Sequence, residues 1–476
     1  MVAAVTAVAV AAGGYLVLDI VDVAPGVLTR DTVAQPEPLP SATATSAAPV
    51  VLPTPVETAA PLPDADLSAP VPAPTVLRRE VADELADPAL GPSVGVTVRD
   101  AYTGDRLLDR DADRPRVPAS TAKLLTALAV GATLDPAATF PTTVVQGRSA
   151  SEVALVAGGD SLLAAGRGRP TSVAGRAGLG DLARQVAAAL QAAGTSAVTV
   201  RLDVSYAAGP RYAPGWSMAD VAAGFTQGVA MLGLASQRPA PGRPSPARPE
   251  DEVLDAFVAA LRPLGVRATA APSGSRSVRA AKGATELGRV ESAPVRDVLA
   301  LALDDSDNAL TESLARQAAV QAGGKATFGA AVDFVRRTVA RLGVDLDGVV
   351  LTDTSGLSGG QRVPARALGD VMELGASGTV PAMRDTLAQL PVAHLDGTLH
   401  DRFDERGSRS AGGIARAKTG TLTGASGLAG TVTTRDGRVL TYAVMADRVP
   451  GGFAGTVAAR AALDRFVAAL ASCGCR

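Results

Sequence analysis

Residues 118–130 read PASTAKLLTALAV, and the interpretation of the whole chain starts from this stretch. Pro118 disfavours helix in the residue before it, and the apolar side chains after Ser120 recur at helical spacing. The pattern predicts a helix N-terminus at Ser120, with Lys123 one turn further on the same face. Serine is a common helix cap, but a hydroxyl next to a lysine that can lose its proton is also an activated nucleophile. This motif alone does not decide between the two interpretations.

Lysine and asparagine are rare in this chain, so their positions carry information. Among 476 residues the sole asparagine is Asn308, and the four lysines are Lys123, Lys282, Lys325 and Lys418. The charge is nearly balanced, with 45 Lys and Arg against 47 Asp and Glu. A nucleic-acid-binding protein would show a basic excess, so we expect no nucleic-acid partner.

The asparagine ends the stretch DDSDN, residues 304–308, which leads into a second apolar run at helical spacing. Ser306 or Asp307 could simply cap that helix. A Ser-x-Asn turn could also present the Ser306 hydroxyl for proton relay and the Asn308 amide to a substrate carbonyl.

Residues 417–424 read AKTGTLTG, and their β-branched side chains predict a strand. Lys418 could merely protect an exposed sheet edge from pairing. Alternatively, Lys418 supplies positive charge and Thr419 a hydroxyl for a substrate carboxylate. Gly420 would allow another backbone to approach closely.

Ser-x-x-Lys, Ser-x-Asn and Lys-Thr-Gly occur in this order, the set found in serine β-lactamases and penicillin-binding proteins. From about residue 92 to 447 the chain resembles the DacB-type serine D-alanyl-D-alanine carboxypeptidase/endopeptidases, the class C low-molecular-mass penicillin-binding proteins. Four further stretches carry the resemblance: VAGGD at 156–160, GPRYAPGW at 209–216, DTSGLS at 353–358 and DGTL at 396–399. The gap of 186 residues between Ser120 and Ser306 is long, as in this family, where a domain is inserted there. It is shorter than in the larger members, so part of that insertion is expected to be missing. The chain departs from many relatives at Gly359, where they carry an arginine.

The resemblance implies an α/β fold of the serine β-lactamase/penicillin-binding-protein type, an antiparallel sheet flanked by helices, with an inserted second domain. It implies acyl transfer: a serine attacks the carbonyl between two D-alanines of a peptidoglycan stem peptide, and water releases the shortened peptide. The N–H groups of Ser120 and Thr421 would form the oxyanion hole. The implied catalytic residues are Ser120, Lys123 as the base, Ser306 and Lys418, and the implied substrate-binding residues are Asn308, Thr419, Gly420 and Thr421. β-Lactam antibiotics would act as inhibitors, and neither a metal nor an organic cofactor is implied.

Two other functions share these motifs. A β-lactamase must deacylate penicillin quickly, and class A enzymes do so with a Glu and a nearby Asn, class C enzymes with a Tyr-x-Asn. The single Asn308 already belongs to the Ser-x-Asn turn, which argues against both. A catalytically silent β-lactam sensor of the cell envelope is the other alternative.

The first part of the chain favours export. Residues 1–18 contain no charged residue, and 24–75 hold twelve of the 33 prolines. An apolar segment followed by a chain that cannot pack is typical of a signal peptide or membrane anchor with a linker, although a buried core helix would also fit. The predicted layout is a targeting segment at 1–23, a linker at 24–75, a catalytic domain at 76–140 and 292–472, and an inserted domain at 141–291. We therefore expect an extracytoplasmic protein of the cell envelope, secreted or anchored in the membrane.

Alternating and turn-forming residues predict the sheet. Valines alternate over 94–98 and lead through a turn to Leu107 and Leu108, while strands at 428–433 and 439–444 flank Asp436-Gly437. A helix is expected at 455–471 and a strand of the inserted region at 198–204. Both chain ends should therefore complete one sheet.

Histidine and cysteine argue against a zinc site. The two histidines, His394 and His400, and the two cysteines, Cys473 and Cys475, lack zinc-ligand spacing. His400 could in principle belong to a Ser-His-Asp triad, but both histidines are expected in surface loops. Cys473 and Cys475 could form a bridge or remain two thiols.

Overall fold

The computed structural model describes residues 68–474. The expected targeting segment 1–23, most of the expected linker 24–75 and Cys475 lie outside the described residues. The compact unit that carries the site begins at Pro70, slightly before the expected start at residue 76. Within residues 68–474 no helix combines the length and the apolar composition that a membrane span needs.

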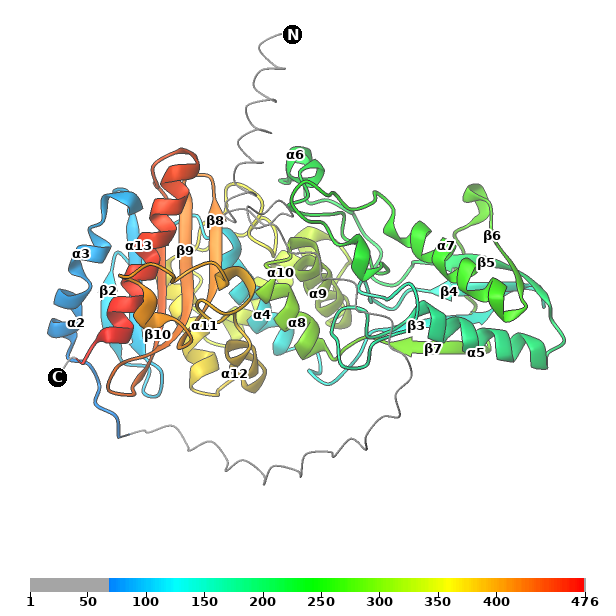
Figure 1. Ribbon diagram of the computed structural model, residues 1–476, viewed down its shortest axis with the longest axis horizontal. Helices are drawn as coiled ribbons and strands as arrows, with labels where there is room; N and C mark the ends of the chain where they lie inside the picture. Colours follow the sequence, from blue (N-terminus) through cyan, green and yellow to red (C-terminus); the bar gives the residue numbers. More distant parts are fainter. Residues whose placement is uncertain (1–67, 475–476) are drawn as a thin grey trace, which may run out of the picture. The chain divides into compact units, whose positions relative to one another are not determined.

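A five-stranded antiparallel sheet joins the two ends of this unit, in the order β2-β1-β10-β9-β8 (Figure 1). Its strands are β1 (Val94–Asp100), β2 (Arg106–Arg110), β8 (Ala415–Leu422), β9 (Ala425–Thr433) and β10 (Val439–Ala446). Val96 of β1 pairs with Val444 of β10, which confirms that strands from both chain ends complete one sheet. The expected hairpins are confirmed, and Gly437 adopts φ 87° in the β9–β10 turn, a conformation that glycine tolerates best.

Helices cover both faces of this sheet because neighbouring residues of a strand point to opposite sides. On one face Tyr442 and Val444 join a core with the C-terminal helix α13 (Gly452–Ser472), which confirms the expected final helix. On the other face Ala443 and Met445 join a core with the central helix α4. Helices of the two layers are α2 (Pro74–Glu80), α3 (Ala82–Leu85), α4 (Lys123–Gly131), α8 (Val295–Asp304), α9 (Asn308–Gln321), α10 (Phe328–Arg341), α11 (Ala365–Ala376) and α12 (Pro381–Ala388).

A second five-stranded sheet, in the order β6-β5-β4-β3-β7, comes from the middle of the chain (Figure 1). Its strands are β3 (Pro141–Gln146), β4 (Glu152–Val156), β5 (Ala197–Asp203), β6 (Arg267–Ala270) and β7 (Glu286–Glu291). Strand β5 confirms the strand expected at 198–204, and it runs parallel to β4 and β6. The helices of this region are α5 (Leu179–Ala192), α6 (Met218–Ala222) and α7 (Pro249–Leu261), and the apolar faces of α5 and α7 share a core with the sheet.

Candidate active site

Ser120 lies in a tight turn that feeds directly into the central helix. A 3₁₀ turn spans Ala119–Ala122, and α4 continues from Lys123. Ser120 lies inside the 3₁₀ turn, whose cap residue is Pro118, and the cap residue of α4 is Ala122, so the interpretation of Ser120 as a simple helix cap is wrong. Ala119 adopts φ 47°, which is unusual for a residue with a Cβ atom and often marks functional sites.

Lys123 is the centre of a hydrogen-bond network. Its Nζ donates to Ser120 Oγ at 2.9 Å, to Asn308 Oδ1 at 2.6 Å and to the Ser355 carbonyl at 2.8 Å. The side chain is completely buried, and this burial lowers the pKa of Lys123 to about 8, against the opposing effect of the charges of Asp353, Asp307 and Glu312. A lysine with that pKa is partly neutral near pH 8 and can then accept the proton of the Ser120 hydroxyl.

The Ser-x-Asn turn lies between α8 and α9. Asp307 caps α9, because its Oδ1 accepts the N–H of Leu310 at 2.9 Å. Ser306 is therefore free of the capping role; it adopts φ 54° and is partly exposed. The Asn308 amide group donates from Nδ2 to the Phe225 carbonyl at 3.0 Å, so a substrate amide would have to compete with that bond.

Lys418 lies on the edge strand β8 but is completely buried. The interpretation of Lys418 as an exposed edge-protecting residue is therefore wrong. Burial lowers the pKa of Lys418 well below its usual range, the charge of Lys123 lowers it further, and Asp304 acts in the opposite direction. Its Nζ donates to the Thr419 carbonyl at 3.0 Å. A carboxylate that binds beside this amine would favour its protonated form, because a nearby opposite charge stabilises the charged state.

Strand β8 packs closely against the turn that contains Ser120. A Cβ atom on Gly420 would lie 2.7 Å from the Pro118 carbonyl oxygen, so the expectation of a close backbone approach at Gly420 is confirmed. Thr421, the next residue, pairs with Ser426 of β9. Thr419 Oγ1 donates to Thr398 Oγ1 at 3.0 Å. The sequence alone assigns no role to Thr398, although it lies in the DGTL stretch.

The predicted site residues fall into three groups in the structure. Ser120, Lys123 and Asn308 are joined directly by hydrogen bonds. The strand residues Lys418, Thr419, Gly420 and Thr421 lie against the Ser120 turn through Gly420. Ser306 forms the third group by itself, two residues before Asn308. Within residues 68–474, the hydrogen bonds that join Ser120, Lys123 and Asn308 do not involve the Ser306 hydroxyl.

Sequence reasoning missed the residues that hold the DTSGLS segment. The Asp353 carboxylate accepts the N–H of Gly356 and that of Ser358, both at 2.7 Å, and the indole N–H of Trp216 at 2.9 Å. Gly356 has φ 84°, and a Cβ atom there would lie 1.9 Å from the Ala119 carbonyl oxygen. The DTSGLS segment therefore packs directly against the Ser120 turn at Ala119. Its only signal in the sequence is the DTSGLS motif itself, which does not reveal these contacts.

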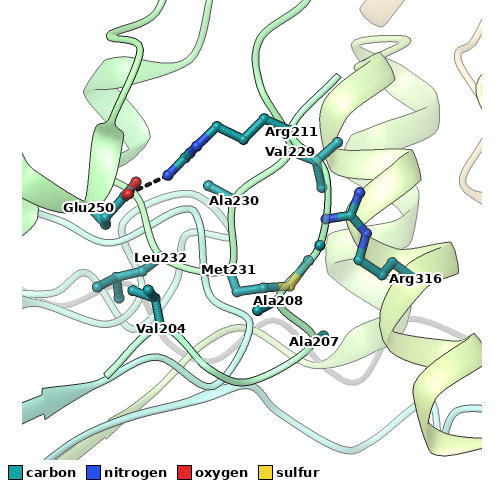
Figure 2. Close-up of a pocket in the computed structure, with 11 residues that line it drawn as sticks. Val204, Ala207, Ala208, Arg211, Val229, Ala230, Met231, Leu232, Glu250 and Arg316 are labelled. Atoms are coloured by element: carbon teal, nitrogen blue, oxygen red, sulfur yellow. Dashed lines mark hydrogen bonds and ion pairs between the residues drawn. The ribbon is translucent and has the colours of Figure 1, made fainter. Parts of the chain in front are cut away.

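Figure 2 shows a small cavity between α9 and the middle region of the chain, and Ser120 is not among the residues that line it. It measures about 80 Å³, and Arg211, Glu250, Met231 and Arg316 are among its lining residues. A volume this small cannot hold a peptide substrate, because ligand pockets are typically several hundred cubic ångströms. The buried Arg316 donates to the Pro210 carbonyl at 2.6 Å, which fixes the GPRYAPGW stretch to α9.

Both histidines are exposed, as expected for surface loops. His400 Nδ1 contacts Asp401 Oδ1 at 2.5 Å, whereas Ser120 Oγ contacts Lys123 Nζ. Within the described residues, His400 and Ser120 therefore belong to different hydrogen-bond networks. Among residues 68–474, no group of three or more His, Cys, Asp and Glu side chains could hold a metal ion.

Comparison with known proteins settles the family. The profile of the D-Ala-D-Ala carboxypeptidase 3 (S13) family matches residues 77–238 and 235–470. The chain belongs to this family. The resemblance inferred from the three motifs is thus confirmed, and with it the expectation of a serine-type D-alanyl-D-alanine carboxypeptidase.

Individual relatives agree with this assignment. The chain is 39% identical to the carboxypeptidase DacB of Mycolicibacterium smegmatis over 86% of this chain and 87% of that protein. It is 30% identical to the D-alanyl-D-alanine carboxypeptidase of an Actinomadura species over 77% of this chain and 80% of that protein. The fold is similar to that of penicillin binding protein 4 (dacB) from Haemophilus influenzae, with a TM-score of 0.64, 18% identity, and coverage of 82% of this chain and 97% of that one. The expected penicillin-binding-protein fold is therefore confirmed.

Proposed function

We propose that this enzyme cleaves the bond between the two D-alanines of peptidoglycan stem peptides through an acyl-enzyme on Ser120. The observation that carries the proposal is the 2.9 Å contact between Lys123 Nζ and Ser120 Oγ. A base must lie within hydrogen-bond reach of the proton it removes and must be neutral at working pH. Lys123 meets the first condition by geometry, and burial, which lowers its pKa to about 8, supplies a neutral fraction of the amine near that pH.

The acylation step follows from this contact. Lys123 takes the hydroxyl proton as Ser120 Oγ bonds to the carbonyl carbon of the penultimate D-alanine. The carbonyl oxygen becomes negative, and the backbone N–H groups of Ser120 and Thr421 stabilise it. As the C–N bond breaks, the leaving D-alanine nitrogen receives a proton relayed through Ser306 and Lys418.

Substrate binding uses the edge strand and the Ser-x-Asn turn. Lys418 and Thr419 hold the terminal carboxylate, and the buried position of Lys418 makes that charge pairing strong. Asn308 holds a substrate amide in place of its bond to the Phe225 carbonyl. Water then attacks the ester on Ser120, Lys123 again serves as base, and the shortened peptide leaves.

We also propose that β-lactams inhibit by acylating Ser120. The β-lactam leaving group stays tethered to the acyl group and hinders water. Asn308 Oδ1 is already bound to Lys123, so it is not available in a second carboxylate-and-amide pair that could position a water for fast deacylation.

The decisive experiment measures two reactions of the full-length protein. We expect catalytic release of D-alanine from a D-Ala-D-Ala peptide, together with a long-lived penicillin adduct on the peptide that contains Ser120, found by mass spectrometry. Rapid penicillin hydrolysis without a trapped adduct would favour a β-lactamase. An adduct without release of D-alanine would favour a sensor. Assaying a cross-linked dimeric stem peptide alongside would determine whether endopeptidase activity accompanies carboxypeptidase activity.

We infer that 76–140 and 292–472 form the catalytic domain and that 141–291 form the inserted domain. Two separate sheets support this division: strands of the first lie in 94–110 and 415–446, and those of the second lie in 141–291. The second sheet also has its own apolar core with α5 and α7.

Membership of a peptidoglycan-acting family supports a location in the cell envelope. We further propose that residues 1–23 export the chain and anchor it in the membrane, supported by their uncharged first 18 residues and the proline-rich stretch that follows. The full chain should then fractionate with membranes, whereas a chain starting near residue 76 should be soluble. Recovery of full-length protein in the cytosol would contradict the export proposal.

A further inference from the structure

Glu312 is a buried carboxylate that the proposed mechanism does not use. It lies on α9 one turn after Asn308, so both side chains share one face of the helix. Glu312 is only 1% exposed, and its carboxylate accepts three hydrogen bonds. Oε1 accepts the N–H groups of Thr354 and Ser355, both at 2.8 Å, and Oε2 accepts the Thr354 hydroxyl at 2.6 Å.

The 354–355 segment is held between two helices by side chains. From α9, Glu312 accepts both of its N–H groups. From α4, Thr126 Oγ1 donates to the Thr354 carbonyl at 2.6 Å and Lys123 Nζ donates to the Ser355 carbonyl at 2.8 Å. Every backbone polar group of this dipeptide thus has a side-chain partner. The Ser355 N–H also donates to Asp353 Oδ1 at 3.2 Å, but Glu312 accepts both N–H groups, and at the shorter distance for Ser355.

The Ser355 carbonyl in turn directs the Lys123 amine. Among the three acceptors that residues 68–474 place around Lys123 Nζ, it is the only backbone atom, and the others are Ser120 Oγ and Asn308 Oδ1. A misplaced carbonyl would therefore turn the amine away from the Ser120 hydroxyl. Misplacement of about 1 Å in such contacts can cost on the order of 100-fold in rate.

We propose that Glu312 is a positioning residue for acylation, which aims Lys123 at Ser120 through the Ser355 carbonyl and whose negative charge acts on the Lys123 amine. This inference rests on the proposed function of Ser120 and Lys123. It extends that function to a residue that touches neither the substrate nor the reacting atoms.

The charges around the two groups determine the sign of the electrostatic effect. Lys123 faces the carboxylates of Asp307, Glu312 and Asp353, which raise its pKa, and the second amine of Lys418. Burial, followed by the charge of Asp353, raises the pKa of Glu312 to about 7, and Arg316 on the same helix also faces it. Above pH 7 Glu312 is largely ionised and favours the protonated amine. Removing its charge should lower the pKa of Lys123, so that the neutral base forms at lower pH.

Two variants separate position from charge. Glu312→Gln keeps the length of the side chain and an oxygen for the two N–H groups but removes the charge. Glu312→Asp keeps the charge but is one methylene shorter and cannot reach all three donors. Asp160→Asn is a matched control, because Asp160 is also buried with a pKa raised to about 7 by burial, yet it is not among the carboxylates that act on Lys123.

The pKa of Lys123 can be measured directly, because a chain with four lysines gives few lysine signals. Two of the other lysines, Lys282 and Lys325, are exposed. NMR titration of the full-length protein labelled with ¹³C at the lysine ε-carbons should resolve Lys123, assigned through its loss in Lys123→Arg. We expect its midpoint near pH 8 in the parent protein. It should lie lower by about one pH unit in Glu312→Gln and be unchanged in Glu312→Asp and Asp160→Asn. An unchanged midpoint in a folded Glu312→Gln, or a lowered one in Glu312→Asp, would overturn the charge effect.

Acylation by a fluorescent penicillin then tests positioning. Glu312→Asp should acylate about ten-fold more slowly or worse, with the acid limb of its pH profile unmoved. Acylation of Glu312→Asp at the parental rate would overturn the positioning role. The NMR titration needs no substrate, so it distinguishes failure of this inference from failure of the proposed function, which would appear as a parent protein that forms no adduct.

Discussion

Replacing Ser120 with alanine is expected to abolish both release of D-alanine and penicillin labelling, a loss of roughly 10,000-fold or more in turnover. The loss should be this large because covalent catalysis requires the hydroxyl itself, and Ser120 Oγ is the hydroxyl that Lys123 Nζ contacts within residues 68–474. The measurement is D-alanine release under saturating peptide, with intact-protein mass spectrometry after exposure to penicillin.

The Ser120→Ala variant should remain folded, because Ser120 is partly exposed and its side chain caps no helix. Its thermal unfolding midpoint should therefore stay close to the parental value. Ser149→Ala is a matched control at an exposed position of the middle region and should keep parental activity. A Ser120→Ala protein that still forms a stable penicillin adduct would show that another residue is the nucleophile.

Replacing Lys123 with arginine is expected to lower the acylation rate by about two orders of magnitude or more. Arginine keeps the positive charge, but a guanidinium does not lose its proton at working pH and cannot act as a base. General-base catalysis commonly contributes at least this factor. The rate is read from D-alanine release and from the time course of penicillin labelling.

Because Lys123 is completely buried, the larger guanidinium could also disturb packing. Circular dichroism and thermal unfolding of Lys123→Arg separate loss of the base from loss of the fold. Lys282→Arg, at an exposed position, is the matched control and should behave like the parent. Near-normal turnover in a folded Lys123→Arg would mean that another group takes the proton from Ser120.

Much of the fold could be predicted because its signals are local. Alternation of valines over 94–98 and the Asp436-Gly437 turn indicate the strands β1, β9 and β10. These signals arise within a few residues, from side-chain alternation and from the freedom of glycine at positive φ. The extent of α13 is likewise visible as a helical apolar face.

The three motifs also identify the chemistry from residue types and their order. In a chain with four lysines and one asparagine, two lysines and that asparagine lie in the motifs. Where local signals allow two interpretations, the tertiary contacts choose between them. Ser120 is not a cap, Asp307 rather than Ser306 is one, and Lys418 is buried.

The sequence by itself thus determined the local patterns of the strands, the three motifs and the family to which they point. Tertiary structure alone decided which groups surround Lys123, since Asn308 and Ser355 reach it from 185 and 232 residues away. It also decided the hydrogen bond from Asn308 to the Phe225 carbonyl and the hydrogen bond from the Ser355 N–H to Glu312. The physical reason is that a lowered lysine pKa comes from removing water and placing charges in space. The spacing of neighbouring residues determines neither the burial of a side chain nor the distance between remote segments.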